Sequence, residues 1–304
     1  MWNNVVGHKN QIDALQKTIA SGKLPNAWLF AGPRGIGKRK VAQGLAAALC
    51  CESKNAPCMT CDACMKVSKS IHPDVVAVER ETQQLKIEQV RELTQRMQFH
   101  SLESKHKVAI IDDADTMTPS AANAILKLLE EPPESTHFVL VTAAAHRLLP
   151  TIRSRCHRIS FSPLGDEEVV SYLQTKENWN ASDATHAARL AQGSIGVAME
   201  LNSEFIDGVL GRFEAVSSGA SAADIISVSE AWAGDSEHTG ATLDLLAGWF
   251  RDRLRSSVLE NQGGCSEEIL LGQLDSIARA RDIADTTANK QLMFEQLLFN
   301  ICGK

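Results

Sequence analysis

The chain has 304 residues, which is enough for two or three domains with a substantial core. Hydrophobic residues make up 44% of it and charged residues 22%, as in ordinary globular proteins, and the formal net charge is -6. This acidic balance argues against strong autonomous binding to DNA, because such binding needs a dense basic surface. The first residues lack a basic segment followed by an apolar core, and no apolar run approaches a membrane span, so we expect a cytoplasmic protein without a signal peptide.

The first elements are a helix, a strand and a second helix. An apolar pattern through Ile12, Leu15 and Ile19 predicts a helix that ends at Gly22. An apolar strand is expected over residues 27–31, and an Ala- and Leu-rich helix over residues 38–49.

The turn between that strand and that helix has the sequence GPRGIGKR at residues 32–39 and fits the phosphate-loop pattern GxxxxGK. Gly32, Gly35 and Gly37 would let backbone N–H groups close on phosphate oxygens, and Lys38 would reach the outer phosphates. The next position should be Ser or Thr, whose hydroxyl holds Mg²⁺, but it is Arg39. This substitution argues against nucleotide hydrolysis. The alternative interpretation is a glycine turn that holds no ATP or ADP.

Five of the eight cysteines lie between positions 50 and 64. In a reducing cytoplasm this crowding favours a metal over disulfides, and four thiolates suit structural, tetrahedral Zn²⁺ with no open coordination position. The expected ligands are Cys51, Cys58, Cys61 and Cys64. Cys50 is the alternative first ligand, but it continues the apolar face of the preceding helix, where a free cysteine packs as a small hydrophobe. Buried or redox-active thiols are the other interpretation.

Further strands and helices alternate up to residue 161. Strands are predicted over residues 74–78, 107–111, 138–141 and 158–161; helices over residues 87–97 and from Thr118-Pro119 to just before Pro132. This alternation predicts an α/β fold: a parallel sheet flanked by helices, with nucleotide chemistry at the carboxyl ends of the strands.

Acidic residues follow the buried strand at 107–111. Asp112 would hold Mg²⁺ through water, and Asp113 occupies the position where a Glu often polarises the attacking water. Thr142 ends the next strand, so it is a further candidate for the nucleotide site. The alternative is that the acids cap the following helix or face solvent.

Strand signals stop after residue 164. Short helices fit residues 166–176, 183–191 and 195–202, and the remaining pattern is helical only, with breaks near residues 217–221, 234–240 and 262–264. We therefore expect three domains: an α/β nucleotide-binding-like domain over residues 1–162 that includes the cysteine module at about 51–64, a small helical lid over 163–203, and a helical domain over 204–304.

Together these segments resemble a bacterial DNA polymerase III clamp-loader subunit of the AAA+ class. The resemblance runs from Val5 to about Leu201 and includes VVG at 5–7, the phosphate loop, the cysteine module, NAILKLLEEPP at 123–133 and, most tellingly, SRC at 154–156. Beyond that region the resemblance is only one of helical content and length.

Within this family the chain is more similar to the delta-prime type than to the gamma/tau motor type. Arg39 replaces the Mg²⁺-binding Ser or Thr, Asp113 replaces the usual Glu, and Gly196 occupies the position of the motor's sensing Arg. The delta-prime resemblance implies a subunit whose own ATPase activity is weak or absent and which contains no polymerase active site.

The resemblance also implies a pentameric ring with delta- and gamma/tau-type subunits, joined through the C-terminal collar domain. Such a ring opens a sliding clamp and loads it at primer–template DNA. Arg155 would be offered in trans to the ATP of a neighbour, where an Arg stabilises the charge that develops in phosphoryl transfer. We expect Arg155 on a connecting segment, between a helical stretch that ends near Pro150 and the strand that begins near Arg158. The alternative role for Arg155 is a local salt bridge.

Two other functions stay open. An ATP-hydrolysing AAA+ motor is favoured by Lys38 and Asp112 and opposed by Arg39, Asp113 and Gly196. A zinc-dependent nucleic-acid-binding protein is opposed by the acidic balance and by the lack of aromatic stacking clusters near the cysteines.

Overall fold

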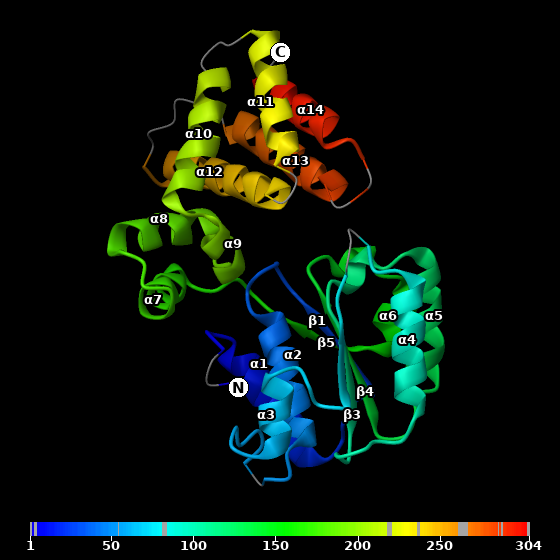
Figure 1. Cartoon of the computed structure of the whole chain (residues 1–304). Helices are drawn as coiled ribbons and strands as arrows, with labels where there is room; N and C mark the ends of the chain where they lie inside the picture. Colours follow the sequence, from blue (N-terminus) through cyan, green and yellow to red (C-terminus); the bar gives the residue numbers. More distant parts are fainter. Residues whose placement is uncertain are drawn as a thin grey trace. The chain divides into compact units, whose positions relative to one another are not determined.

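The computed structural model describes residue 2 and residues 5–53, 55–80, 84–217, 221–235, 238–260, 267–284, 286 and 288–302. The chain divides into two compact units, Met1–Leu164 and Gly165–Lys304 (Figure 1). The further division of the second unit into a lid and a helical C-terminal domain stays a prediction.

The first unit is built on a five-stranded, wholly parallel sheet in the order β2-β3-β4-β1-β5. Its strands are β1 (Ala27–Ala31), β2 (Val75–Val78), β3 (Lys107–Ile111), β4 (Thr136–Thr142) and β5 (His157–Ser160). The predicted parallel α/β sheet is confirmed. Because all strands run the same way, the turns after β1, β3 and β4 meet at one edge of the sheet.

Helices cover both faces of this sheet (Figure 1). On one face are α1 (Lys9–Ser21), α2 (Lys38–Cys50) and α3 (Asp62–Ser68); on the other are α4 (Ile87–Gln98), α5 (Pro119–Glu130) and α6 (Pro150–Arg155). Two single 3-10 turns, η2 (Ala114–Thr116) and η3 (Ala145–Arg147), follow β3 and β4.

Two hydrophobic cores, one on each face, hold the helices to the sheet. Successive side chains of a strand point to opposite faces, so Trp28 and Phe30 enter the core with α1 and α2, whereas Ala27 and Leu29 enter the core with α4 and α5. The same alternation continues in β3 and β4. A parallel strand covered on both faces has no exposed side, which is why these strands read as continuous apolar runs.

Local chemistry sets the ends of several elements. The hydroxyl of Thr118 accepts from the backbone N–H of Ala121 at 3.2 Å and caps α5, as the sequence predicts. β4 begins two residues earlier than predicted, at Thr136. Its second residue, His137, is polar but buried. Nδ1 of its ring lies 2.9 Å from the carbonyl oxygen of Pro25, so the imidazole has a hydrogen-bond partner in the interior.

All secondary-structure elements described in the second unit are helices. Its helices are α7 (Asp166–Lys176), α8 (Ala181–Ala191), α9 (Ile195–Glu200), α10 (Ser203–Ser217), α11 (Ala222–Gly234), α12 (Thr239–Glu260), α13 (Glu267–Ala284) and α14 (Lys290–Cys302). The break predicted near 234–240 falls between α11 and α12. Most of the break near 217–221 and all of the break near 262–264 lie outside the described residues. Across the described parts of both units, no helix has the length and apolar character needed to cross a membrane.

Helices α8 and α12 approach each other closely within the second unit. A Cβ placed on Gly248 of α12 would lie 2.1 Å from the carbonyl oxygen of Leu190 in α8. Beside this contact, Arg189 donates to Asp252 at 2.9 Å. The glycine therefore permits a helix packing that a larger residue would push apart.

Candidate functional site

The predicted phosphate loop connects β1 to α2 at the carboxyl edge of the sheet. Gly35 and Gly37 have φ angles of 72° and 101°, in the left-handed region that favours glycine. A Cβ on Gly32 would lie 2.3 Å from the carbonyl oxygen of Phe161, so the loop passes close to the segment after β5. The sequence motif thus forms a tight strand–loop–helix turn that only small residues allow.

Lys38 begins α2 and is almost fully buried. Its Nζ donates to the carbonyl oxygens of Gly32 at 2.7 Å and Pro33 at 2.6 Å. Burial lowers the pKa of this ammonium to about 8, and Asp112 and other nearby carboxylates offset part of the effect. The lysine is therefore bound to the loop itself in this structure.

Arg39 replaces a metal-binding hydroxyl and meets carboxylates directly. Its guanidinium pairs with Glu79 and lies 3.7 Å from a carboxylate oxygen of Asp112. Burial, reinforced by the charge of Asp113, raises the pKa of Asp112. The carboxylate proposed for Mg²⁺ thus has an arginine of its own chain as a nearby cation, in addition to Lys38.

Asp113 has a basic partner as well. Arg80 Nε lies 3.0 Å from a carboxylate oxygen of Asp113, whose backbone adopts φ 46°. Sequence reasoning did not identify Glu79 and Arg80 as part of this site. A signal was available, because both residues directly follow β2, and the carboxyl ends of parallel strands lie at the same edge.

Thr142 lies beside the loop, as the sequence suggests. Its carbonyl oxygen accepts from the backbone N–H of Gly32 at 3.3 Å, and its hydroxyl donates to the carboxylate of Asp115. The same carboxylate oxygen accepts from the backbone N–H of Ala143 at 3.2 Å. The structure therefore brings the loop, Asp112, Asp113 and Thr142 to one edge of the sheet.

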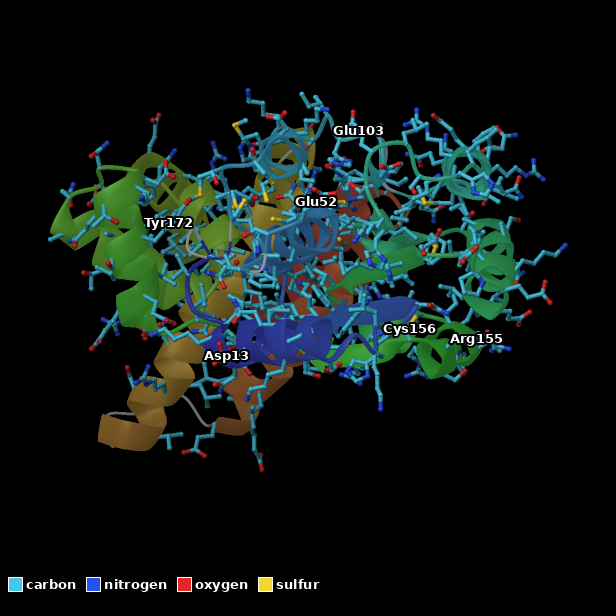
Figure 2. The ribbon with its side chains drawn as sticks, turned by 90° about the horizontal axis from the view of Figure 1, so that it is seen from below. Asp13, Glu52, Glu103, Arg155, Cys156 and Tyr172 are labelled. Carbon is cyan, nitrogen blue, oxygen red and sulfur yellow. The ribbon has the colours of Figure 1, made fainter. Side chains whose placement is uncertain are left out.

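Arg155 is the last residue of α6, at the periphery of the first unit (Figure 2). The expectation that it lies on a connecting segment after a helix ending near Pro150 is wrong. Pro150 begins the helix, since its fixed φ suits the first helical position. The guanidinium donates from Nη1 to the carbonyl oxygen of Thr151 at 2.9 Å and lies with Nη2 2.7 Å from Glu130 Oε1.

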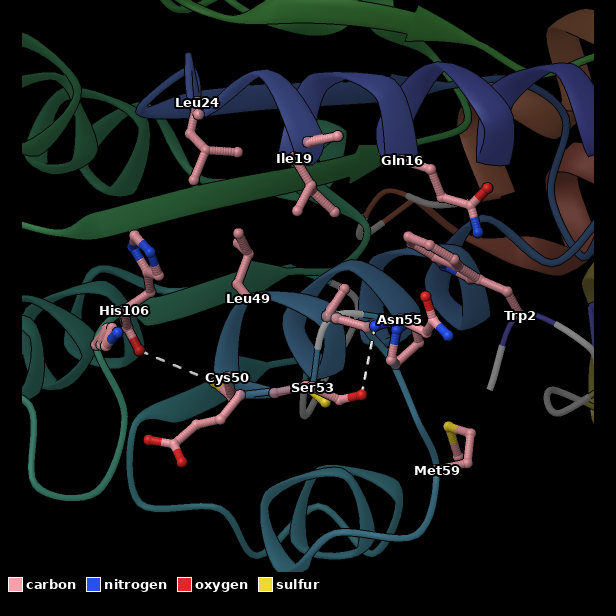
Figure 3. Close-up of a pocket in the computed structure, with 18 residues that line it drawn as sticks. Trp2, Gln16, Ile19, Leu24, Leu49, Cys50, Ser53, Asn55, Met59 and His106 are labelled. Atoms are coloured by element: carbon pink, nitrogen blue, oxygen red, sulfur yellow. Dashed lines mark hydrogen bonds between the residues drawn. The ribbon is translucent and has the colours of Figure 1, made fainter.

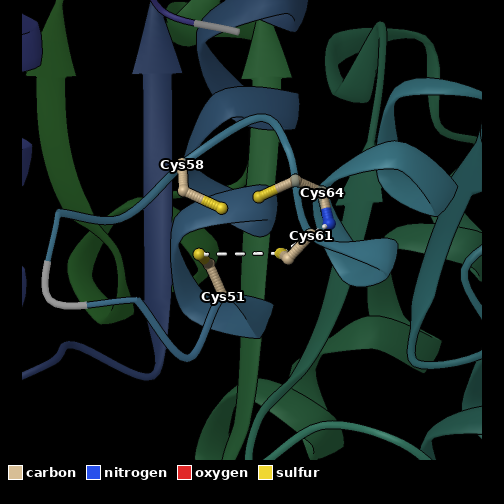
Figure 4. Close-up of side chains that lie close together, drawn as sticks. All are labelled: Cys51, Cys58, Cys61 and Cys64. Carbon is tan, nitrogen blue, oxygen red and sulfur yellow. Dashed lines mark hydrogen bonds between the residues drawn. The ribbon is translucent and has the colours of Figure 1, made fainter.

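The sulfur atoms of Cys51, Cys58, Cys61 and Cys64 all lie within 4.8 Å of one another (Figure 4). Cys51 follows the end of α2, Cys61 precedes α3, and their sulfurs are 3.8 Å apart. Sulfurs bound about 2.3 Å from a tetrahedral Zn²⁺ lie about 3.8 Å apart, so the cluster fits such an ion after a small contraction. Burial raises the pKa of the Cys64 thiol. This cluster can bind a metal.

Cys50 is not part of the four-cysteine cluster. Its Sγ lies 3.9 Å from the carbonyl oxygen of His106, and it lines a cavity of about 860 Å³ between the end of α1 and the loop at residues 51–59 (Figure 3). Burial raises the pKa of its thiol to about 11. This environment is the one expected for a packed, free cysteine.

The chain is similar to known subunits of DNA polymerase III and to solved structures, among them the following four. DNA polymerase III subunit delta' of Bacillus subtilis is 36% identical over 199 residues, which are 64% of this chain and 59% of that protein. Subunit gamma of Buchnera aphidicola subsp. Acyrthosiphon pisum is 31% identical over 207 residues, which are 66% of this chain and 57% of that protein. Subunit tau of Escherichia coli K12 is 32% identical over 212 residues, which are 67% of this chain and 32% of that protein. A gamma subunit-related protein of Thermotoga maritima aligns over 96% of this chain and 98% of its own, with a TM-score of 0.48 and 19% identity.

The chain therefore spans less than two thirds of the length of these three sequence relatives. The family model described as DNA polymerase III, delta subunit, matches residues 7–165. This match covers more than half of the chain and includes the sheet, the phosphate loop, the cysteine cluster and α6. The chain accordingly belongs to the family of DNA polymerase III clamp-loader subunits of the AAA+ class.

Proposed function

We propose that this chain is a delta-prime-like scaffold of the DNA polymerase III clamp loader. In this role it assembles with delta- and gamma/tau-type subunits in a pentameric ring that loads a sliding clamp at primer–template DNA. It hydrolyses little or no ATP itself, and it lends Arg155 in trans to the ATP site of a neighbouring subunit.

The observation that carries this proposal is the pairing of Arg39 with Glu79 and Asp112. A magnesium ion held at this loop needs a hydroxyl at position 39 and a carboxylate facing it. Here a fixed positive charge occupies the hydroxyl's position and neutralises the carboxylate, and a second cation at the same place would be repelled. The loop can then keep its shape without supporting hydrolysis.

The alternative is a gamma/tau-like motor that hydrolyses ATP. Lys38 and Asp112 support it, because both are retained at the carboxyl edge of the sheet. The relatives do not separate the two roles, since delta', gamma and tau subunits match with 36%, 31% and 32% identity. Arg39 supports the scaffold, because its guanidinium lies where the motor needs a metal-binding hydroxyl.

Arg155 suits a role in trans. It ends a six-residue helix at the edge of the first unit, and its side chain is 36% exposed. A planar guanidinium at such a position can bind the terminal phosphate of a nucleotide held by another chain. Hydrolysis would then depend on assembly of the ring.

We also propose that the four-cysteine cluster holds a structural Zn²⁺. The sulfurs converge from the end of α2, the following loop and the start of α3, and four thiolates leave no open position for substrate. The ion would fix α3 against α2 and so stabilise the first unit.

The test of the scaffold role uses complexes rebuilt from the partner subunits with variants of this chain. Arg155→Ala should slow hydrolysis at one neighbouring site by about a thousandfold, with a smaller loss in total clamp- and DNA-stimulated ATPase, because the other sites keep their own arginines. Arg153→Ala, a change of an exposed residue in the same helix, is the matched control and should behave as wild type.

Lys38→Ala distinguishes the two functions in the same assay. The scaffold role predicts nearly unchanged ATPase in the assembled complex, because the loop of this chain does not support turnover. A large loss of activity with Lys38→Ala, together with normal activity for Arg155→Ala, would show that the chain is a motor.

A further inference from the structure

We propose that Glu130 is a positioning residue for Arg155: it holds the guanidinium at the end of α6 in the orientation that a neighbour's phosphate meets. This inference rests on the proposed function of Arg155. It assigns a role to a residue of α5 that the sequence motif alone leaves without one.

Two contacts from different elements fix the guanidinium. Nη2 lies 2.7 Å from Oε1 of Glu130, the last residue of α5, and Nη1 donates to the carbonyl oxygen of Thr151 in the first turn of α6. Contacts on two different nitrogens set both the position and the plane of the group. Since a guanidinium carries five N–H donors, these contacts leave donors for a phosphate.

The pair serves orientation more than stability. The side chains of Arg155 and Glu130 are 36% and 48% exposed, and ion pairs at such exposure contribute little to folding. An arginine side chain without a partner samples many rotamers. This conformational freedom is lost when the guanidinium binds a phosphate, which weakens binding. Glu130 restricts them in advance, as supporting residues do for other reactive groups.

The acidic neighbour Glu131 offers a matched comparison. It lies at the end of α5 and is exposed, but among the described contacts its side chain has no ion pair with Arg155. Removing Glu131 changes the local charge by the same amount as removing Glu130 and leaves the guanidinium held. The two variants therefore separate positioning from a general electrostatic effect.

The negative charge of Glu130 also repels a nearby phosphate, and this repulsion opposes the benefit of positioning Arg155. Solvent and salt screen this charge at an exposed site, whereas misplacing a reactive group by about 1 Å costs on the order of a hundredfold in rate. We therefore expect orientation to dominate. If repulsion dominated instead, removing the carboxylate would speed hydrolysis.

The first experiment follows Arg155 in the full-length, ¹⁵N-arginine-labelled chain by NMR. In the wild type, rotation of the guanidinium should be slow and the Nε–H group ordered. Glu130→Ala should make both mobile, Glu130→Gln should restore part of the order through its carbonyl oxygen, and Glu131→Ala should match the wild type. Equal mobility in the wild type and Glu130→Ala would overturn the proposal without touching the role of Arg155.

The second experiment measures clamp- and DNA-stimulated ATPase in rebuilt complexes. Glu130→Ala should lower kcat at the neighbouring site by about tenfold with KM unchanged, Glu130→Gln should recover part of it, and Glu131→Ala should show no loss. Glu130→Ala should add nothing when combined with Arg155→Ala, because the two residues act as one unit.

The outcomes separate the two proposals. A loss with Arg155→Ala but none with Glu130→Ala overturns the positioning role and leaves the proposed function intact. Faster hydrolysis with Glu130→Ala also overturns positioning, because the carboxylate would then hinder. No effect of Arg155→Ala overturns the proposed function, and the positioning role with it.

Discussion

Arg39 is the residue at which this chain departs most clearly from a working magnesium site. Its guanidinium pairs with Glu79 and Asp112, while Arg80 pairs with Asp113 and Lys38 donates to carbonyl oxygens of its own loop. The charged groups at this edge of the sheet are therefore already paired with one another or with the backbone. A nucleotide would have to displace these internal contacts before it gained its own.

The first residue-scale prediction is that Arg39→Thr creates magnesium-dependent ATP binding. The change removes one positive charge, adds a hydroxyl and frees two carboxylates for the metal. The interaction of unit charges about 4 Å apart is worth about 1 kcal/mol in water and about 4 kcal/mol near a protein surface, so we expect at least about a fivefold gain in affinity. Calorimetry with Mg²⁺ and with a chelator measures it. Lys40→Thr, one residue further on, is the control, and equal affinities for the two variants would contradict the prediction.

Lys38 gives a pH-dependent prediction. Its folded pKa is about 8 and the ordinary value is 10.5, so the folded state releases the proton first as the pH rises. Below pH 8 the destabilisation from burying the charge is fully present, and it is relieved between pH 8 and 10.5. Lys38→Met should therefore lose its stability advantage over the wild type across that window, by up to about 3 kcal/mol. Urea unfolding of Lys38→Met and of the wild type at pH 7.5 and pH 10 tests this, and a difference between the two proteins that stays the same at both pH values would contradict it.

At the scale of elements, α3 adjoins the cysteine cluster. The helix has only seven residues, Asp62–Ser68, and isolated helices of this length are unstable in water. Cys61 precedes it and Cys64 lies in its first turn, so a bound metal would tie the helix to the end of α2. Metal binding would thus supply stabilisation that so short a helix cannot gain by burying apolar surface.

Cys61→Ser should release the metal and lower the free energy of unfolding of the first unit by at least about 3 kcal/mol, because a structural site contributes folding free energy directly. Cys50→Ser is the matched control, since its sulfur contacts the carbonyl oxygen of His106 instead, and it should keep a full equivalent of zinc. Metal analysis and urea unfolding provide the two readouts. Full zinc retention in Cys61→Ser would rule the cluster out as the binding site.

Sequence patterns located the elements well wherever a single physical cause dominates. The apolar runs of β1 and β3 follow from burial on both faces, and Thr118-Pro119 gives the start of α5. Sequence patterns predict an element's bounds less well where contacts with residues distant in the sequence determine them. The start of β4 depends on the contact of His137 with Pro25.

The candidate site shows the same division. The spacing of the cysteines predicts that four of them converge, and the glycine motif at residues 32–38 predicts the tight turn between β1 and α2. The partners of Arg39 and Arg155 could not be read from spacing, because Glu79 and Glu130 reach them through strand order and helix packing. The sequence predicts a helix end near Pro150, whereas Pro150 begins the short α6, because its fixed φ suits the first helical position.

At the scale of the whole molecule, the division into Met1–Leu164 and Gly165–Lys304 suggests two cooperative units with separate cores. The close contact of α8 and α12 lies inside the second unit, and the cysteine cluster lies inside the first. Changes at these two places should therefore affect different unfolding transitions. Substitutions at distant sites without shared partners are additive in stability.

Gly248→Ala tests this independence. The added Cβ would lie 2.1 Å from a backbone oxygen of Leu190, so α8 and α12 must separate, at a cost of about 1–3 kcal/mol. Gly272→Ala in α13 is the control, because nothing lies within 4 Å of its Cβ, and it should stabilise the same unit by about 0.5–1 kcal/mol through helix propensity. Urea unfolding followed by far-UV circular dichroism and by zinc release reports on the two units together. Because both units contain helices, Gly248→Ala should shift only the second unit's part of the circular-dichroism transition to lower urea and leave the midpoint of zinc release unchanged. A shift of both midpoints by the same amount would show that the units unfold as one.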